Sequence, residues 1–74
     1  MMRKVFYIKG LECAHCAEKM ERAILKIKGV EDASINFMTQ KLAIEVDTTT
    51  FEEVMKEVEK VVKKIESNVE IVEA

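Results

Sequence analysis

The chain has 74 residues, which is enough for one domain near the lower size limit for folding without disulfides or a metal ion. Its net charge is −2 and its acidic and basic residues are interspersed, which argues against the basic face of a nucleic-acid-binding protein. No apolar run approaches the roughly 18 residues of a membrane span and the N-terminal residues lack a signal-peptide pattern, so we expect one cytoplasmic domain, residues 1–74, without direct membrane insertion.

The first predicted elements are a strand and a helix. Residues 3–9 are rich in β-branched and aromatic side chains and predict a strand that Gly10 ends. Residues 14–28 place apolar side chains at helical spacing with charged side chains between them, which predicts an amphipathic helix. Gly29 follows, and we expect it to end this helix in a left-handed conformation.

A hairpin is predicted in the middle of the chain. Residues 32–38 and 41–46 each alternate apolar and polar side chains, which is typical of strands with one buried face. Only Thr39 and Gln40 separate these strands, so we expect them to pair as antiparallel neighbours.

A second helix and a last strand complete the chain. Thr50, with Glu53 three residues later, fits a capping box, in which both side chains satisfy free N–H groups at the start of a helix. Residues 51–65 then carry a continuous apolar stripe at helical spacing. We expect Asn68 to end this helix in a left-handed cap, and residues 69–72 to form a short strand.

The element order is therefore β-α-β-β-α-β. Each predicted strand has two different faces, and each predicted helix has one apolar stripe that must be buried. A four-stranded antiparallel sheet with both helices on one face satisfies these requirements. We therefore predict an α+β fold, the ferredoxin-like βαββαβ sandwich.

Both cysteines and the only histidine lie where the first strand gives way to the first helix. Cys13 directly precedes the helix and Cys16 lies in its first turn, so both sulfurs can converge beyond the helix N-terminus. Free N–H groups and the helix dipole favour thiolate there. This arrangement leaves three kinds of site to compare: a dithiol–disulfide couple, a closed structural zinc site, and an open site for a soft metal ion.

The open site is favoured over the other two. A redox couple of the thioredoxin type would have flanking Trp, Gly or Pro residues and a longer chain. A closed zinc site needs four protein ligands, and beyond the cysteines there is only His15, which on a helix points about 100° away from the Cys16 sulfur. Two thiolates suit Cu⁺, and they suit Zn²⁺, Cd²⁺ or Pb²⁺ when further ligands join. An incomplete coordination sphere also lets a partner's ligands take the metal.

The stretch that holds the cysteines resembles the Gly-Met-x-Cys-x-x-Cys signature of heavy-metal-associated domains, and it reads Gly10-Leu11-Glu12-Cys13-Ala14-His15-Cys16. The likeness extends over the whole chain, through Gly29-Val30 and Ile35-Asn36-Phe37. It implies the ferredoxin-like fold, and it places Cys13 and Cys16 on the family's metal-binding cysteines. Leu11 takes the position of a Met that the family buries, and we expect it to pack under the loop.

Two departures from copper-binding members bear on the metal. Glu12 stands where copper domains commonly have Thr, and an acidic residue there resembles the zinc/cadmium/lead ATPase branch. A carboxylate oxygen favours Zn²⁺ over Cu⁺ because it adds charge and raises the coordination number. The Gly-Tyr or Gly-Phe pair that copper domains carry before the last strand is absent, and residues 65–68 stand in its place. We therefore expect Cys13, Cys16 and Glu12 to bind Zn²⁺ or Cd²⁺/Pb²⁺, with Cu⁺ as the alternative.

The resemblance implies a domain that binds and transfers a soft divalent metal ion and is not itself an enzyme. Its expected partners are the transport domains of a metal-exporting P-type ATPase, covalently attached or docked, or a metallochaperone. A Cu⁺ chaperone or copper-ATPase domain, a thiol–disulfide redox protein and a purely structural interaction domain remain as alternatives. We expect a monomer, with a metal-bridged dimer as an alternative. His15 is expected to face solvent, and Glu66 to be a solvated acid at a helix end.

Overall fold

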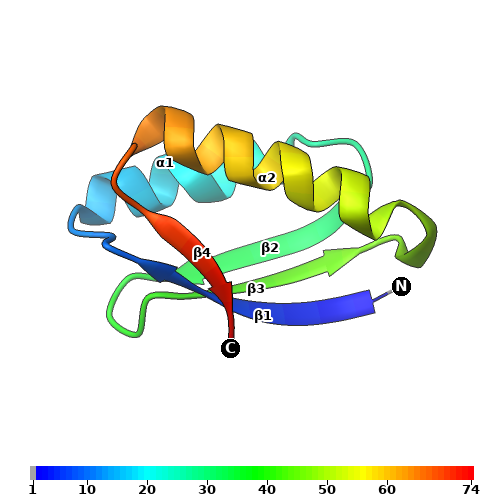
Figure 1. Cartoon of the computed structure of the whole chain (residues 1–74), viewed down its shortest axis with the longest axis horizontal. Coiled ribbons are helices and arrows are strands. Elements are labelled where there is room, and N and C mark those ends of the chain that lie inside the picture. Colours follow the sequence, from blue (N-terminus) through cyan, green and yellow to red (C-terminus); the bar gives the residue numbers. More distant parts are fainter. Residues whose placement is uncertain (1) are drawn as a thin grey trace.

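Two helices cover one face of a four-stranded antiparallel sheet, and the other face carries no helix (Figure 1). The computed structural model describes residues 2–74; Met1, the first residue of the predicted domain 1–74, lies outside the described residues. The elements are β1 (Met2–Lys9), α1 (Ala14–Leu25), β2 (Val30–Asn36), β3 (Lys41–Val46), the 3₁₀ helix η1 (Thr48–Thr50), α2 (Phe51–Ile65) and β4 (Glu70–Glu73). The strand order is β2-β3-β1-β4. This architecture confirms the predicted ferredoxin-like α+β fold.

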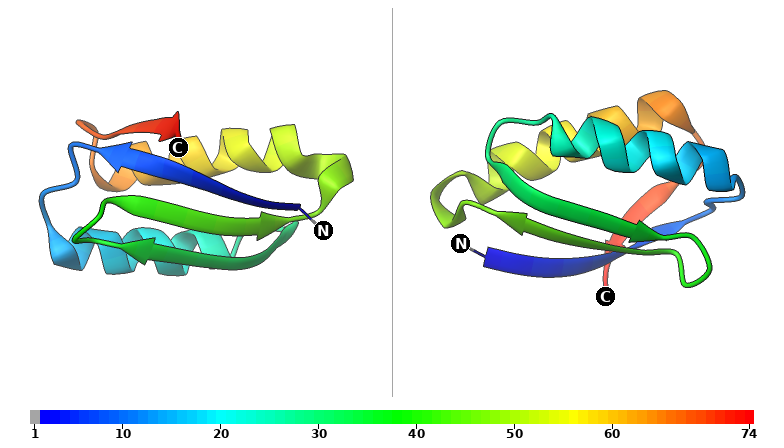
Figure 2. Two further views of the ribbon diagram at one scale, coloured as in Figure 1. Left: turned by 90° about the horizontal axis from the view of Figure 1, so that it is seen from below. Right: turned by 180° about the vertical axis from the view of Figure 1, so that it is seen from behind.

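The antiparallel pairing brings three loops together. Strand β1 pairs with β3 on one side and with β4 on the other, and β2 pairs with β3. Because neighbouring strands run in opposite directions, residues 10–13, 37–40 and 66–69 lie at the same end of the molecule (Figures 1 and 2). We call this end, formed by those three segments, the loop end. Both cysteines lie at or beside it.

The core lies between the sheet and the two helices and is mainly aliphatic. The apolar faces predicted for the strands and helices are the buried ones. The fully buried larger side chains come from β1, the first loop, both helices and β3, and are Ile8, Leu11, Met20, Ile24, Leu42, Ile44, Val46, Val58 and Val62. These side chains hold the two layers together by the removal of apolar surface from water.

The ends of both helices differ from the predictions. Helix α1 ends at Leu25 rather than at residue 28, because the next two N–H groups bond to carbonyls three residues back and tighten the chain into a turn. Gly29 has a left-handed φ of +100° but lies in the connection to β2, beyond the helix cap. Helix α2 ends at Ile65, and the next residue, Glu66, has an extended backbone. Asn68 does not have a positive φ, so the left-handed cap predicted there is wrong.

The predicted capping box at the start of α2 is also absent. The Thr50 side chain caps no N–H group of the helix. Instead, Asp47 caps the preceding turn, where its Oδ1 accepts hydrogen bonds from the Thr49 N–H at 3.0 Å and from the Thr49 Oγ1 at 2.9 Å. A carboxylate is a stronger acceptor than a hydroxyl group. The hydrogen bonds from the Thr49 N–H and hydroxyl lower the pKa of Asp47.

The predicted hairpin forms, but its turn is longer than two residues. Strand β2 begins at Val30 with a register shift between Val30 and Asp32, and it ends at Asn36 rather than at residue 38. It ends there because the Asn36 Oδ1 accepts a hydrogen bond from the Thr39 N–H, three residues on, at 3.2 Å and so caps the turn. Strand β3 has the predicted bounds, whereas β4 begins and ends one residue later than predicted.

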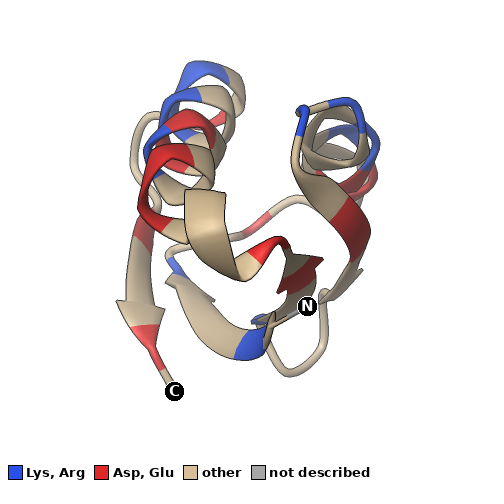
Figure 3. Cartoon of the chain, turned by 90° about the vertical axis from the view of Figure 1, so that its right-hand side faces the viewer, with Lys and Arg blue, Asp and Glu red and all other residues tan. Residues whose placement is uncertain are grey.

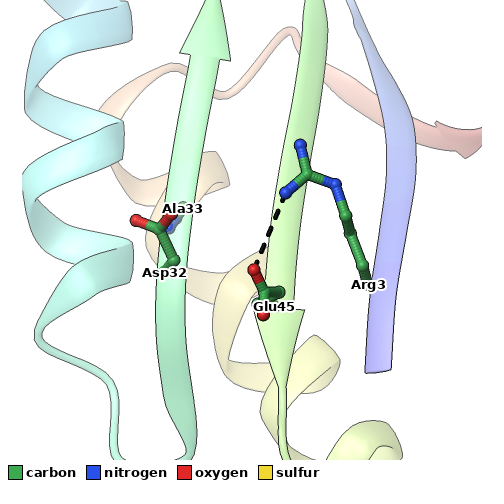
Figure 4. Close-up of polar contacts among 4 residues, drawn as sticks. All are labelled: Arg3, Asp32, Ala33 and Glu45. Atoms are coloured by element: carbon green, nitrogen blue, oxygen red, sulfur yellow. Dashed lines mark hydrogen bonds and ion pairs between the residues drawn. The ribbon is translucent and has the colours of Figure 1, made fainter. Parts of the chain in front are cut away.

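Charged side chains surround the core without forming a face of one sign. Both helices carry acids and bases on their outer sides (Figure 3). On the outer edge of β2, the Ala33 N–H donates to the Asp32 Oδ1 at 2.9 Å (Figure 4), and the Ile35 N–H donates to the Glu21 Oε2 at 2.8 Å. The Arg3–Glu45 ion pair, at 3.6 Å, links β1 and β3 on the open sheet face (Figure 4). No helix within residues 2–74 has the length and apolar character needed to cross a bilayer.

Candidate metal centre

The two cysteines form the start of α1. Cys13 is the N-cap residue, with an extended backbone, and its Sγ accepts a hydrogen bond from the Cys16 N–H at 3.1 Å. This is the position at which Ser, Thr, Asp or Asn usually accepts such a bond. Both thiols are free and half-buried. The predicted placement of the cysteine pair at the helix N-terminus is confirmed.

Hydrogen bonds separate the pKa values of the two thiols. The Cys16 thiol donates to the Cys13 sulfur and, together with the Cys16 N–H, lowers the pKa of Cys13. The same thiol–thiol hydrogen bond, reinforced by desolvation, raises the pKa of Cys16. As the pH rises, Cys13 therefore becomes a thiolate before Cys16 does. A metal ion that binds both sulfurs must release the proton of Cys16.

This difference predicts that alkylation distinguishes the two thiols. Near neutral pH in the metal-free chain, we expect iodoacetamide to modify Cys13 several-fold faster than Cys16. The lower pKa gives Cys13 the larger thiolate fraction, and this gain exceeds the loss in nucleophilicity, which follows pKa with a slope of only about 0.4–0.5. Tandem mass spectrometry that locates the modified cysteine measures the ratio. Equal rates, or a faster Cys16, would contradict the assigned order of the two pKa values.

The loop before the cysteines is anchored from three directions. Leu11 is buried with 1% of its surface exposed, so the side chain packs beneath the loop as predicted. Gly10 has a φ of +87°, and a Cβ built on it would lie 2.9 Å from the Asn68 carbonyl oxygen, so the α2–β4 loop touches the backbone here. On the other side, the side-chain amide of Gln40 donates a hydrogen bond to the Leu11 carbonyl. The contact of Gln40 was not predicted, because 29 residues separate it from Leu11 and no local pattern marks it.

The other candidate ligands do not form a close group with the two cysteines. Glu12 and His15 are both exposed. Within residues 2–74, no three His, Cys, Asp or Glu side chains are grouped closely enough to hold a metal ion. Glu66 is half-buried at the C-cap of α2, so it lies at a helix end as the sequence predicts but is partly covered. Its charge is a minor influence on the thiols, which opposes the lowering of the Cys13 pKa and adds to the raised pKa of Cys16.

The chemistry of this arrangement is that of an open thiolate pair. Two sulfurs at one helix N-terminus supply soft donors, and the Glu12 carboxylate is adjacent to Cys13 in the sequence. Two thiolates alone suit Cu⁺, whereas Zn²⁺ and Cd²⁺ require additional donors. The loop end leaves room for such donors because both cysteines keep part of their surface exposed to solvent.

Residues 5–70 match the family described as the heavy-metal-associated domain. The cadmium, zinc and cobalt-transporting ATPase of Bacillus subtilis is 31% identical over 71 residues, which are 96% of this chain and 10% of that protein. The probable copper-importing P-type ATPase A of Enterococcus hirae is 33% identical over 58 residues, which are 78% of this chain and 8% of that protein. A solved copper-binding domain of a P-type ATPase has the same fold, with a TM-score of 0.77 at 21% identity and coverage of 100% of this chain and 95% of that one. The chain spans about a tenth of the length of these curated relatives or less.

Proposed function

Because the chain belongs to the heavy-metal-associated domain family, we propose that it binds a soft metal ion through Cys13 and Cys16 and passes the ion to a partner protein. The observation that carries this proposal is the pair of free, half-buried thiols that share one helix N-terminus. The lowered pKa of Cys13 makes its thiolate easier to form, and binding of the metal ion supplies the energy to deprotonate Cys16.

We propose that the native ion is Zn²⁺ or Cd²⁺/Pb²⁺ rather than Cu⁺. Glu12, directly before Cys13, offers a carboxylate oxygen as third ligand, and an oxygen donor suits a divalent ion better than it suits Cu⁺. Relatives named for transport of cadmium and zinc and a relative named for copper both resemble this chain, so the choice depends on the residues around the thiols.

A second carboxylate competes for the same role. Glu66 is half-buried and its charge acts on both thiols, whereas Glu12 is exposed. Rotation of the Glu12 side chain toward the sulfurs requires no change in the core, because Glu12 contacts solvent. We propose Glu12 as the third ligand and a water molecule or a partner's group as the fourth, with Glu66 as the alternative donor.

Competitive titration of three variants tests this assignment. We expect Glu12→Gln to weaken Zn²⁺ and Cd²⁺ binding by about tenfold or more, because a first ligand counts for at least as much as the 10–100-fold typical of outer-shell groups. Cu⁺ binding should change far less, since two thiolates satisfy Cu⁺. Glu66→Gln is the comparison variant, and Glu18→Gln on the exposed side of α1 is the matched charge control.

The pattern of the three affinities identifies the ligand. Weakening by Glu66→Gln alone would assign the third place to Glu66 and refute the role of Glu12. Equal small losses of affinity in all three variants would show that Glu12 and Glu66 act only through their negative charge. A wild-type chain that binds Cu⁺ far more tightly than Zn²⁺ and is unaffected by Glu12→Gln would favour the copper alternative.

We also propose the setting in which the domain works. An open two-thiolate site allows a partner's ligands to replace Cys13 and Cys16 one at a time, so that the ion is never released into solution. The natural partners are the transport domains of a metal-exporting P-type ATPase, to which this domain is attached or docks, or a metallochaperone. Such an exchange takes place on the cytoplasmic side of the membrane, with the domain acting as a binding module and the ATPase doing the transport.

A further inference from the structure

One side chain connects the β2–β3 hairpin to the cysteine loop. The Gln40 carbonyl accepts a hydrogen bond from the Ile8 N–H at 2.8 Å, and the Gln40 side-chain amide donates to the Leu11 carbonyl. Gln40 therefore holds the chain on both sides of Gly10, at the end of β1 and in the loop that follows it. Among residues 2–74, this amide makes the only side-chain hydrogen bond that reaches the loop from an element distant in the sequence.

The backbone of Gln40 does not require glutamine. Its φ is +58°, and it is the only residue other than glycine with a positive φ among those that the structure describes. Gly or Asn adopts this conformation more readily than Gln does. The side-chain bond to Leu11 is therefore a feature separate from the turn, and removal of the side chain can leave the turn intact.

The Leu11 carbonyl belongs to the peptide that leads into Glu12 and Cys13. A fixed carbonyl fixes the plane of the Leu11–Glu12 peptide, and this limits how far the backbone of the next two residues can move. The buried Leu11 side chain anchors the loop from below, and the Asn68 backbone limits it beside Gly10. The Gln40 amide, from the β2–β3 hairpin, supplies the remaining constraint.

We propose that Gln40 is a positioning residue for the metal loop, an inference that rests on the proposed metal-binding function. By holding the Leu11–Glu12 peptide, it keeps the Cys13 sulfur in the orientation that binds the ion and slows the opening of the loop. Groups that orient metal ligands in this way commonly change affinity by about 10–100-fold when they are removed. The expected effect is on metal release, with little effect on the stability of the fold.

Two variants remove the amide donor in different ways. Gln40→Gly removes the side chain and eases the left-handed backbone, whereas Gln40→Glu keeps its length and replaces the donor with an acceptor. Met38→Ala is the matched control, because Met38 lies in the same turn, is 87% exposed and makes no hydrogen bond to the loop. The readouts are the rate of Cd²⁺ release to a chelator, the melting temperature and the amide exchange of Glu12 and Cys13 in the metal-free chain.

We expect both Gln40 variants to release Cd²⁺ about tenfold faster than the wild type and Met38→Ala, with faster amide exchange at Glu12 and Cys13. Gln40→Gly should melt no lower than the wild type. Release rates equal to that of the wild type in both variants would overturn the positioning role. Faster release that occurs only in a variant with a lower melting temperature would overturn it as well. If the wild type binds no Cd²⁺, the proposed function fails, and the amide exchange alone then decides whether Gln40 holds the loop.

Discussion

Replacing Cys13 and Cys16 together with serine will reduce the affinity for Zn²⁺, Cd²⁺ and Cu⁺ by roughly three orders of magnitude or more, because a neutral hydroxyl replaces each thiolate. In the proposed site, these sulfurs supply most of the binding free energy, and the flanking carboxylates are too few to hold a soft ion alone. Competitive titration with a chelator measures the loss, and the thiolate–Cd²⁺ charge-transfer absorption should disappear at the same time.

The same variant should fold normally, which separates the loss of binding from a loss of structure. Serine is among the preferred N-cap residues, so Ser at position 13 can accept the hydrogen bond that the Cys13 sulfur now accepts from the Cys16 N–H. We expect a melting temperature equal to that of the wild type or higher. Cys13→Ala is the contrasting control, because it removes this acceptor and should cost about 1 kcal/mol of stability. A double-serine variant that kept its affinity would show that the metal site lies elsewhere.

The main features of the fold follow from periodicity. A period of two predicted the buried faces of β2 and β3, and a period of 3.6 those of α1 and α2, because one-sided burial selects apolar residues at those spacings. The ends of elements were harder to predict, because they depend on single hydrogen bonds. Asn36 ends β2 by capping a turn, and Asp47 caps η1, whereas the Thr50 side chain does not cap α2. Several short polar residues compete for such roles, and only the folded backbone decides between them.

The candidate site, like the fold, could be predicted only in part from the sequence. The cysteines were identified from their spacing, because their chemistry requires them to be close in sequence. The supporting contacts come from segments that are distant in the sequence: the Gln40 side chain from the hairpin, and the Asn68 backbone beside Gly10. Neither has a local pattern. The ferredoxin-like topology brings them to the loop end, so the arrangement of the site appears only when the strands pair.

The contact between Gly10 and the Asn68 backbone leads to the second large effect. We expect Gly10→Ala to lower the free energy of unfolding by about 2–4 kcal/mol, the sum of a side chain in a left-handed conformation and an overpacked contact. The φ of Gly10 is +87°, and its new Cβ would lie 2.9 Å from the Asn68 carbonyl oxygen, which belongs to the backbone and cannot rotate away. The melting temperature should fall by about 10–25 °C for a domain of this size.

Gly29→Ala provides a matched control, because Gly29 lies in the connection between α1 and β2, which is at the end of the molecule opposite the loop end (Figure 1). Gly29 has a φ of +100°, and its Cβ would lie 2.7 Å from the Val54 Cγ2, so a similar loss of stability is expected. The two variants should differ in metal binding measured well below both melting temperatures. Relief of the new contact at position 10 shifts the α2–β4 loop and the cysteine loop relative to one another. Gly10→Ala should therefore release Cd²⁺ faster than Gly29→Ala, and equal release rates would show that the α2–β4 loop does not support the metal site.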